Sequence, residues 1–388
     1  FTTQVNATQD NGLNFLANIA NPFPNGVIEP PGASLGVNTF LGQGVSFFEP
    51  NVKTPYGQRW QFSIQRELPG RTMFEATYIG DRAVSLETTR DLNATPLQYL
   101  SRTPTRDDTT NNYNGANVPN PFAGLVPTAP GRNGTTVARA ALWAQYPQFT
   151  GVQVNTNQGY SSYHSLAVRI DKRFAKGYTF QGGYTFSKFM EATGYLNGGD
   201  GRPVYTISDQ DYPHRFNASW IYELPFGKSR TMFSGAGRGV DAIIGGWQVQ
   251  GIFVWQSGPP LGFGNSIFYG SNIKSVVLPS EQRTIDRWFD TSQFERATNR
   301  QLVSNVRTMS PRFGGIRGPN PHNWDLSVLK NTKLFEKLGM EIRGEFLNAL
   351  NHPFFAAPNT DPTNSAFGVI SNTRGYSRRI QLGIKLRY

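Results

Sequence analysis

The chain ends in Gly375-Tyr376-Ser377-Arg378-Arg379-Ile380-Gln381-Leu382-Gly383-Ile384-Lys385-Leu386-Arg387-Tyr388, and this stretch decides the fold. From Ile380 onward the even positions are apolar, while Arg379, Gln381, Lys385 and Arg387 occupy odd positions. This period of two predicts a strand with one apolar and one cationic face. Roughly thirteen residues at about 3.3 Å each are enough to cross a bilayer when the strand is tilted. The stretch therefore predicts a membrane-spanning strand, and the alternative is an edge strand of a soluble sandwich.

The composition favours the membrane alternative. Charged residues make up 16% and aromatic residues 13% of the 388-residue chain, whereas a soluble domain carries about 25% charged residues. Residues 242–273 form the longest uncharged run, but Gln and Pro interrupt it and its apolar residues alternate, so we predict no membrane helix. The net charge of +11 comes without a Lys/Arg cluster, which predicts a polar barrel interior and no nucleic-acid partner.

The same alternation recurs along the chain. Residues 1–55 are rich in Asn, Gly and Pro and are predicted to be a loop-rich lead-in segment, followed by barrel strands over 56–388. We expect strands at 56–68, 72–80, 162–174, 178–186, 213–224, 246–256, 323–335, 339–349 and 376–388. One-sided alternation predicts that one set of side chains points outward, namely Phe180, Tyr184, Phe216, Trp220, Phe253, Leu382 and Ile384.

The connections alternate between short and long. Short turns are expected at 69–70, 175–177 and 336–338, an intermediate connection at 225–245, and long loops at 81–161, 190–212, 257–322 and 351–374. Outer-membrane barrels have short periplasmic turns and long extracellular loops, and a soluble sandwich has no reason to sort its connections in this way. The sequence therefore predicts an all-β fold, an antiparallel up-and-down transmembrane β-barrel in the bacterial outer membrane.

The strand count predicts an incomplete barrel. A closed single-chain bacterial barrel has an even number of strands, whereas the periodicity gives about nine, unless a further strand lies in residues 1–55. Phe1 is not an initiator Met, and residues 1–20 lack the basic start and apolar core of a signal peptide. We therefore expect the chain to be a piece of a longer protein.

Several stretches resemble the C-terminal barrel part of TonB-dependent receptors, specifically the Oar-like outer-membrane family. They are Thr54-Pro55-Tyr56-Gly57-Gln58-Arg59-Trp60, Gln65-Arg66-Glu67-Leu68-Pro69, Pro213-His214-Arg215-Phe216, Tyr222-Glu223-Leu224-Pro225-Phe226-Gly227-Lys228, Gly245-Gly246-Trp247-Gln248-Val249, Gln256-Ser257-Gly258, Arg317-Gly318-Pro319, Asn323-Trp324-Asp325-Leu326-Ser327 and Glu345-Phe346-Leu347-Asn348-Ala349-Leu350-Asn351-His352. Their order and spacing carry the resemblance from about residue 51 to the C-terminus.

The resemblance implies a larger barrel of roughly 22 strands with an N-terminal plug, opened by an inner-membrane energy-coupling protein. This sequence contains neither a plug nor a coupling box, so that partner would act through a region N-terminal to this chain. The terminal aromatic Tyr388 resembles the C-terminal assembly signal of outer-membrane barrels, which implies the barrel-assembly machinery as a second partner. Outer-membrane lipid and an unknown transported ligand complete the expected partners.

Polar residues on the second face of the strands are the candidate site. The predicted lumen-facing residues are Arg169, Asp171, Arg173, Gln181, Arg215, Asn217, Gln248, Gln250, Asp325, Glu341, Arg343, Glu345, Arg379, Gln381 and Lys385. Both signs of charge occur on neighbouring strands, so these residues form either an ion-pair lattice that holds the wall and a plug, or a surface that selects the substrate.

Signals for catalysis or cofactors are weak. His164, His214, His322 and His352 have no partner at metal-ligand spacing. Residues 235–239 and 197–201 read as turns rather than phosphate or calcium loops, and no nucleophile elbow is present. We predict no enzyme activity, cofactor or metal, and expect energy-coupled uptake of a bulky substrate such as an oligosaccharide, peptide or metal chelate. The alternatives are a structural or adhesive surface protein and a passive porin-like channel.

Overall fold

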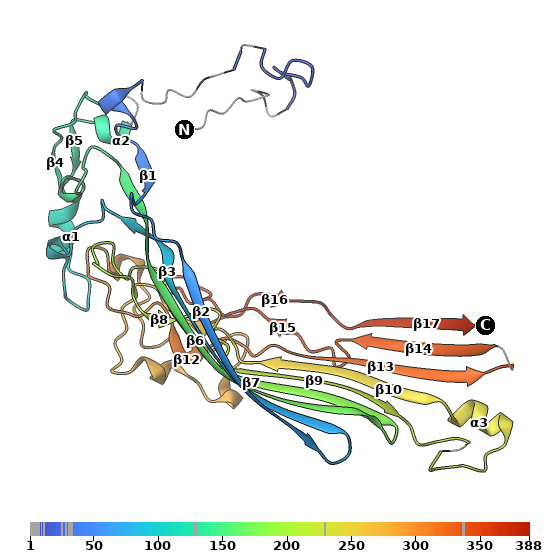
Figure 1. The fold of residues 1–388 in the computed structure, drawn as a ribbon. Helices are drawn as coiled ribbons and strands as arrows, with labels where there is room; N and C mark the ends of the chain where they lie inside the picture. The colour runs from blue at the N-terminus through green and yellow to red at the C-terminus, as the bar shows by residue number, and fades with distance from the viewer. Residues whose placement is uncertain are drawn as a thin grey trace.

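A computed structural model describes residues 34–126, 130–228, 230–335 and 338–388, together with 8, 10, 12–24, 26, 27 and 29. Nine long strands form one antiparallel sheet, which we call the strand wall (Figure 1). In chain order they are β2 (Tyr56–Leu68), β3 (Thr72–Asp91), β6 (Gly151–Ala175), β7 (Tyr178–Ala192), β9 (His214–Glu223), β10 (Trp247–Gln256), β13 (His322–Lys333), β14 (Gly339–Leu347) and β17 (Arg379–Arg387). Each strand pairs with the next along the chain, which confirms the predicted all-β, antiparallel, up-and-down arrangement.

Several predicted boundaries were wrong, among them the end of the strand expected at 178–186, because β7 continues to Ala192. The loop expected at 81–161 is shorter, because β3 continues to Asp91 and β6 already begins at Gly151. These extensions pair with each other, Asp91 opposite Gln153, and rise past the other strands in Figure 1. The lead-in segment 1–55 also contains a strand, β1 (Gly44–Phe48), which pairs in parallel with the β6 extension. The mostly polar sequence of the extensions concealed them, and the Asn-, Gly- and Pro-rich residues around the five-residue β1 concealed that strand.

Short elements fill the connections. The helices are α1 (Asp108–Gly115), α2 (Pro130–Asn133) and α3 (Arg238–Ile244), and the described residues contain no helix long and apolar enough to cross a membrane. The short strands are β4 (Asn117–Pro119), β5 (Thr136–Ala138), β8 (Thr206–Ile207), β11 (Pro260–Leu261), β12 (Phe313–Arg317), β15 (Phe354–Phe355) and β16 (Thr373–Arg374). The predicted turn at 336–338 lies partly outside the described residues, since 336 and 337 are not among them.

Short and long connections lie at opposite ends of the strand wall. The short ones join β2 to β3 and β6 to β7, and the C-terminus lies at the same end, as does the α3 connection (Figure 1). The connections 257–321 and 348–378 pack together at the other end, and we call them the loop cap. This sorting is the one that the sequence predicts for an outer-membrane barrel.

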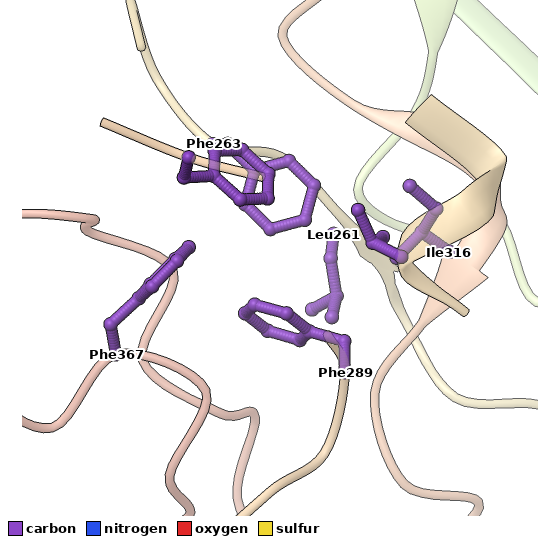
Figure 2. Close-up of a cluster of buried hydrophobic side chains, with 7 residues drawn as sticks. Leu261, Phe263, Phe289, Ile316 and Phe367 are labelled. Carbon is purple, nitrogen blue, oxygen red and sulfur yellow. The ribbon is translucent and has the colours of Figure 1, made fainter. Parts of the chain in front are cut away.

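The main cluster of buried apolar side chains lies in the loop cap and not in the strand wall. Phenylalanine rings from both connections meet there, with centroids 5.2 Å apart for Phe263 and Phe289 and 5.1 Å apart for Phe289 and Phe367 (Figure 2). The buried cluster consists of Leu261, Phe263, Val276, Phe289, Phe294, Ile316 and Phe367. The long loops therefore form a folded body with its own core.

Candidate functional site

Strand register gives the wall one apolar and one polar face, because directly opposed residues of antiparallel strands share a face. One row on the apolar face runs through Phe180, Trp220, Gly251, Leu326, Phe346 and Ile380. One row on the polar face runs through Gln181, Ser219, Ile252 and Asp325, and Leu347 lies opposite Arg379 on the same face of β14 and β17. The side chains predicted to point outward all fall on the apolar face.

The predicted lumen-facing residues come together on the polar face. Register places all of them there except Arg173, which follows the irregularity after Lys172 and lines the same hollow as Asp171. This shared face joins residues from seven strands, β6, β7, β9, β10, β13, β14 and β17, as the period of two predicts. Which side of the wall faces the lumen, and whether these residues touch a substrate, stay predictions.

A hollow of about 690 Å³ crosses the middle of the polar face. Asp171, Gln181, Asp325 and Glu345 contribute polar side chains to it. It is also lined by Ile252 and Leu347, which are 53% and 41% exposed and occupy positions where the alternation calls for polar residues. These two were not among the predicted lumen-facing residues, because only polar side chains were expected to contribute there, although the alternation already placed Ile252 and Leu347 on this face.

Acidic residues on this face are mostly engaged within their own strand. Arg169 Nε lies 2.7 Å from Asp171, and Arg343 contacts Glu341 at 2.9 Å and Glu345 at 3.4 Å. Fewer ion pairs join neighbouring strands than an ion-pair lattice across the wall would need. The closest one between strands joins Arg387 to Glu341 at 2.5 Å. Among the described residues, the predicted cations without an ion pair are Arg173, Arg215, Arg379 and Lys385.

A second hollow of about 310 Å³ lies where the polar face meets the loop cap, and we call it the mouth pocket. Its ring side chains are those of Tyr212, Phe354, Phe355 and Tyr376, and Gln256 and Arg374 add polar groups. Two of the unpaired cations flank it, because Arg215 lies over the Tyr212 ring and Arg379 over the Tyr376 ring, each 4.9 Å from the centroid. The pocket thus combines aromatic surfaces with positive charge.

Two ion pairs, one of them with a buried carboxylate, attach the loop cap to the wall. The Arg317 guanidinium contacts the Asp211 carboxylate at 2.5 Å and donates to the Gly258 carbonyl at 3.0 Å. Asp211 is 1% exposed and also accepts from the Phe189 backbone N–H of β7 at 2.7 Å. A second pair joins Arg312 to Glu191 at 2.5 Å. These contacts explain why Arg317-Gly318-Pro319 stood out in the sequence: its Arg fixes the β10–β13 connection to β7.

A corner at the end of β14 holds the other half of the loop cap. Asn348 has a positive φ of 50° and is 2% exposed. Its backbone N–H donates to Asp325 at 2.8 Å, and its side-chain amide donates to the carbonyls of His352 and Tyr376 at 3.0 and 3.1 Å. Asn tolerates this left-handed conformation better than most residues, so one side chain closes the corner and orients the mouth pocket.

The histidines occupy places that sequence spacing did not reveal. His322 and His352 stack with ring centroids 3.8 Å apart, although 30 positions separate them in the chain. Burial, and secondarily the neighbouring His322, lowers the pKa of His352. The Nδ1 atoms of His164 and His214 contact the hydroxyls of Tyr78 and Tyr184 at 2.8 and 2.7 Å. No cluster of three or more potential metal ligands occurs in the described part of the chain.

The family described as "Outer membrane beta barrel domain" matches residues 1–381. A comparison with curated proteins finds no match. Among solved structures, the chain is similar to the outer membrane transporter YddB from Escherichia coli, with 13% identity and a TM-score of 0.41 over 89% of this chain and 34% of that one.

Two further structures have similar values. The pyoverdine outer membrane receptor FpvA from Pseudomonas aeruginosa has 12% identity and a TM-score of 0.38, over 87% of this chain and 30% of that one. The FrpB iron transporter from Neisseria meningitidis has 9% identity and a TM-score of 0.35, over 89% and 33%. The chain therefore spans about a third of the length of these structures.

Proposed function

The chain belongs to the family of outer membrane beta barrel domains, and we propose that it forms part of the wall and the substrate mouth of an energy-coupled transporter for a bulky, negatively charged substrate. The family places it in the bacterial outer membrane. An oligosaccharide, a peptide or a metal chelate remains the proposed substrate class, and the negative charge is the addition that the geometry supports.

The observation that carries the proposal is the path of unpaired cations and open hollows along the polar face. At the loop end, Arg215 and Arg379 flank the aromatic mouth pocket. Deeper along the same face, the larger hollow offers Gln181, Gln250 and the exposed Ile252. Its three carboxylates are engaged, because Asp171 and Glu345 pair with Arg169 and Arg343, and Asp325 accepts from the Asn348 backbone N–H. Aromatic rings and arginines together bind flat or ring-shaped groups that carry carboxylates. A substrate could therefore be captured at the mouth and passed along the wall.

Energy coupling rests on the sequence resemblance to TonB-dependent receptors. The proposed partners are the inner-membrane coupling protein, acting through a region N-terminal to this chain, and the barrel-assembly machinery, reading the terminal Tyr388. An open hollow alone would equally serve a passive porin-like channel, so coupling has to be tested through the proton gradient.

The test measures uptake in cells that carry the full-length protein and in cells that lack its gene. Fluorescent oligogalacturonate is compared with a neutral malto-oligosaccharide of equal length, and an acidic peptide with a basic one. We expect the full-length protein to raise uptake of an anionic member of one pair. An uncoupler should abolish that uptake, whereas uptake that persists without the proton gradient would reject energy coupling and leave passive diffusion.

Paired substitutions then locate the mouth. Arg215→Gln with Arg379→Gln should reduce uptake of the anionic probe, because the charges beside Tyr212 and Tyr376 are lost. Arg287→Gln is the matched control, since this loop-cap arginine is exposed and faces Asp290 at 3.4 Å. Equal uptake in both variants would remove the mouth pocket from the substrate path.

A structural or adhesive surface protein is the second candidate function. It is favoured by the packed phenylalanine core of the loop cap (Figure 2), because adhesion needs a rigid surface rather than a path through the wall. Loss of cell attachment without loss of uptake, after replacement of surface residues of the loop cap, would support this candidate over transport.

A further inference from the structure

The connection between β9 and β10 is unusual for the short-turn end of the wall. Where β6 and β7 are joined by Lys176 and Gly177, this connection covers 224–246 and contains α3. It is one of the stretches singled out by sequence, and neither the mouth pocket nor the hollow on the polar face involves it.

Two contacts fix α3 beside the apolar face. The indole Nε1 of Trp247 donates to the Ile243 carbonyl at 2.9 Å, and Lys330 Nζ donates to the Gly245 carbonyl at 2.7 Å. Trp247 and Lys330 are directly opposed on β10 and β13, and their row continues through Ile342 to Ile384 on the apolar face. The C-terminal end of α3 thus lies at the border of the face that is predicted to meet lipid.

Four large apolar side chains of this connection are exposed to solvent. Met232, Phe233, Val240 and Ile243 are 52%, 66%, 53% and 71% exposed. The acidic groups nearby are occupied: Glu223, at the end of β9, pairs with Arg230 at 2.8 Å, and the Asp241 carboxylate accepts a hydrogen bond from the backbone N–H of Lys228. Among the described residues, no ion pair engages the side chains of Lys228 and Arg238.

We propose that the α3 connection is an interfacial anchor that binds anionic phospholipid headgroups in the inner leaflet of the outer membrane. Its exposed apolar side chains would enter the boundary between headgroups and acyl chains, and Lys228 and Arg238 would contact lipid phosphates. Such basic and apolar segments are attracted to anionic leaflets. Short turns of outer-membrane barrels lie on the periplasmic side, which selects the inner leaflet.

The exposed apolar surface of the α3 connection is continuous with the apolar face of the wall, and this favours lipid over a periplasmic protein as its binding partner. Ile342 and Ile384, in the row next to α3, are 40% and 73% exposed on the same side of the wall. A protein bound to α3 would have to share this border with the bilayer, whereas a lipid surface covers both at once. The inference concerns the opposite end of the wall from the mouth pocket and does not depend on transport.

The test uses full-length protein reconstituted in vesicles of phosphatidylethanolamine with or without phosphatidylglycerol. The described chain has no Cys, so Ala242→Cys on α3 can carry a polarity-sensitive fluorophore, with Thr363→Cys in the loop cap as the water-exposed comparison. We expect lipids with quenchers near the headgroup to quench the label on residue 242 and not the label on residue 363. Phosphatidylglycerol should increase that quenching, and high salt should reverse the increase.

Variants separate the two kinds of contact. Val240→Asp with Ile243→Asp should abolish lipid quenching at residue 242, and Lys228→Gln with Arg238→Gln should remove only its dependence on phosphatidylglycerol. Heat-modifiable gel mobility reports barrel folding in every variant. A label on residue 242 that aqueous iodide quenches as strongly in vesicles as in detergent would overturn the proposal and point to a periplasmic protein partner instead.

Discussion

In the loop cap, Phe263 and Phe289 are 2% and 1% exposed, whereas Leu166 and Phe186, opposed residues on inner strands of the wall, remain 47% and 51% exposed. The two regions belong to one chain, yet the main cluster of buried apolar side chains lies in the cap. The wall satisfies its backbone through strand ladders and exposes its apolar face, which we expect lipid to cover. The cap excludes water through its own core. Each region is therefore adapted to a different solvent.

The largest expected loss of stability comes from a Phe→Ala substitution in the loop cap, and the same substitution in the wall is the comparison. Phe289→Ala should destabilise the loop cap by about 3–5 kcal/mol, because it leaves a cavity among Phe263 and Phe367. Phe186→Ala removes an equal ring from the apolar face and should leave the cap intact. Limited proteolysis of the loops in outer membranes, with gel mobility as the measure of barrel folding, compares them. Equal protease sensitivity of both variants would contradict a separate core in the cap.

Substitution of the Arg317–Asp211 ion pair, which attaches the loop cap to the wall, should destabilise the cap by a similar amount. Arg317→Met leaves the buried Asp211 carboxylate without its cation, and breaking a buried pair in this way costs about 3–5 kcal/mol. Replacing both partners, with Asp211→Asn added, should recover part of that loss. Arg287→Met is the control, since an exposed pair contributes about 0–1 kcal/mol. Protease cleavage between 257 and 321 measures the effect, and no difference between Arg317→Met and Arg287→Met would show that the pair does not hold the cap.

The wall could be predicted from sequence because its physics is local. A period of two fixes which face each residue joins, so β2 was predicted with its observed ends and the lumen-facing candidates fell on one face. The extensions of β3 and β6 were missed because most of their residues are polar, like the opposed pair Asp91 and Gln153. A short apolar alternation was nevertheless present, since Val152 and Val154 are 3% and 7% exposed.

The loop cap and the mouth pocket could not be predicted because their contacts are long-range. Asp211 and Arg317 meet across two connections, and Phe263 meets Phe367 across more of the chain. Nothing in the local sequence pairs these residues, and the Pro- and Gly-rich composition of the loops conceals a core built from isolated phenylalanines. One sequence signal was available: Arg317-Gly318-Pro319 matched a family pattern, which marked the residue without revealing its partner.

Placing an arginine on one face or the other of β10 tests which face of the wall meets lipid. Phe253→Arg puts a cation on the apolar face and should destabilise the inserted barrel by about 2–4 kcal/mol if that position lies near the bilayer midplane. Val254→Arg places the same cation one residue later on the polar face, where Val254 is 43% exposed beside Asn217 and Asn323. Urea-induced unfolding in vesicles measures both. A larger loss for Val254→Arg would reverse the assignment of the two faces.

The smallest expected effect is a pH response confined to the cap. Burial and the stacked His322 ring hold the pKa of His352 below its ordinary value of about 6.5. A histidine with a lowered pKa favours folding while it is neutral, so its contribution is complete above about pH 6.5 and is lost as the pH falls through the lowered pKa.

Acidification should therefore loosen the 348–378 connection, where Asn348 and the β15–β16 hairpin depend on the position of His352, and leave the strand ladders unchanged. Hydrogen exchange of this connection at pH 7.5 and pH 5 measures the response. His352→Phe retains a ring against His322 and removes the titrating group, so it should abolish the response. His214→Phe, which alters a histidine of the wall, should retain it. Acid-induced exchange that persists in His352→Phe would assign the response to another group and leave the histidine stack a purely packing contact.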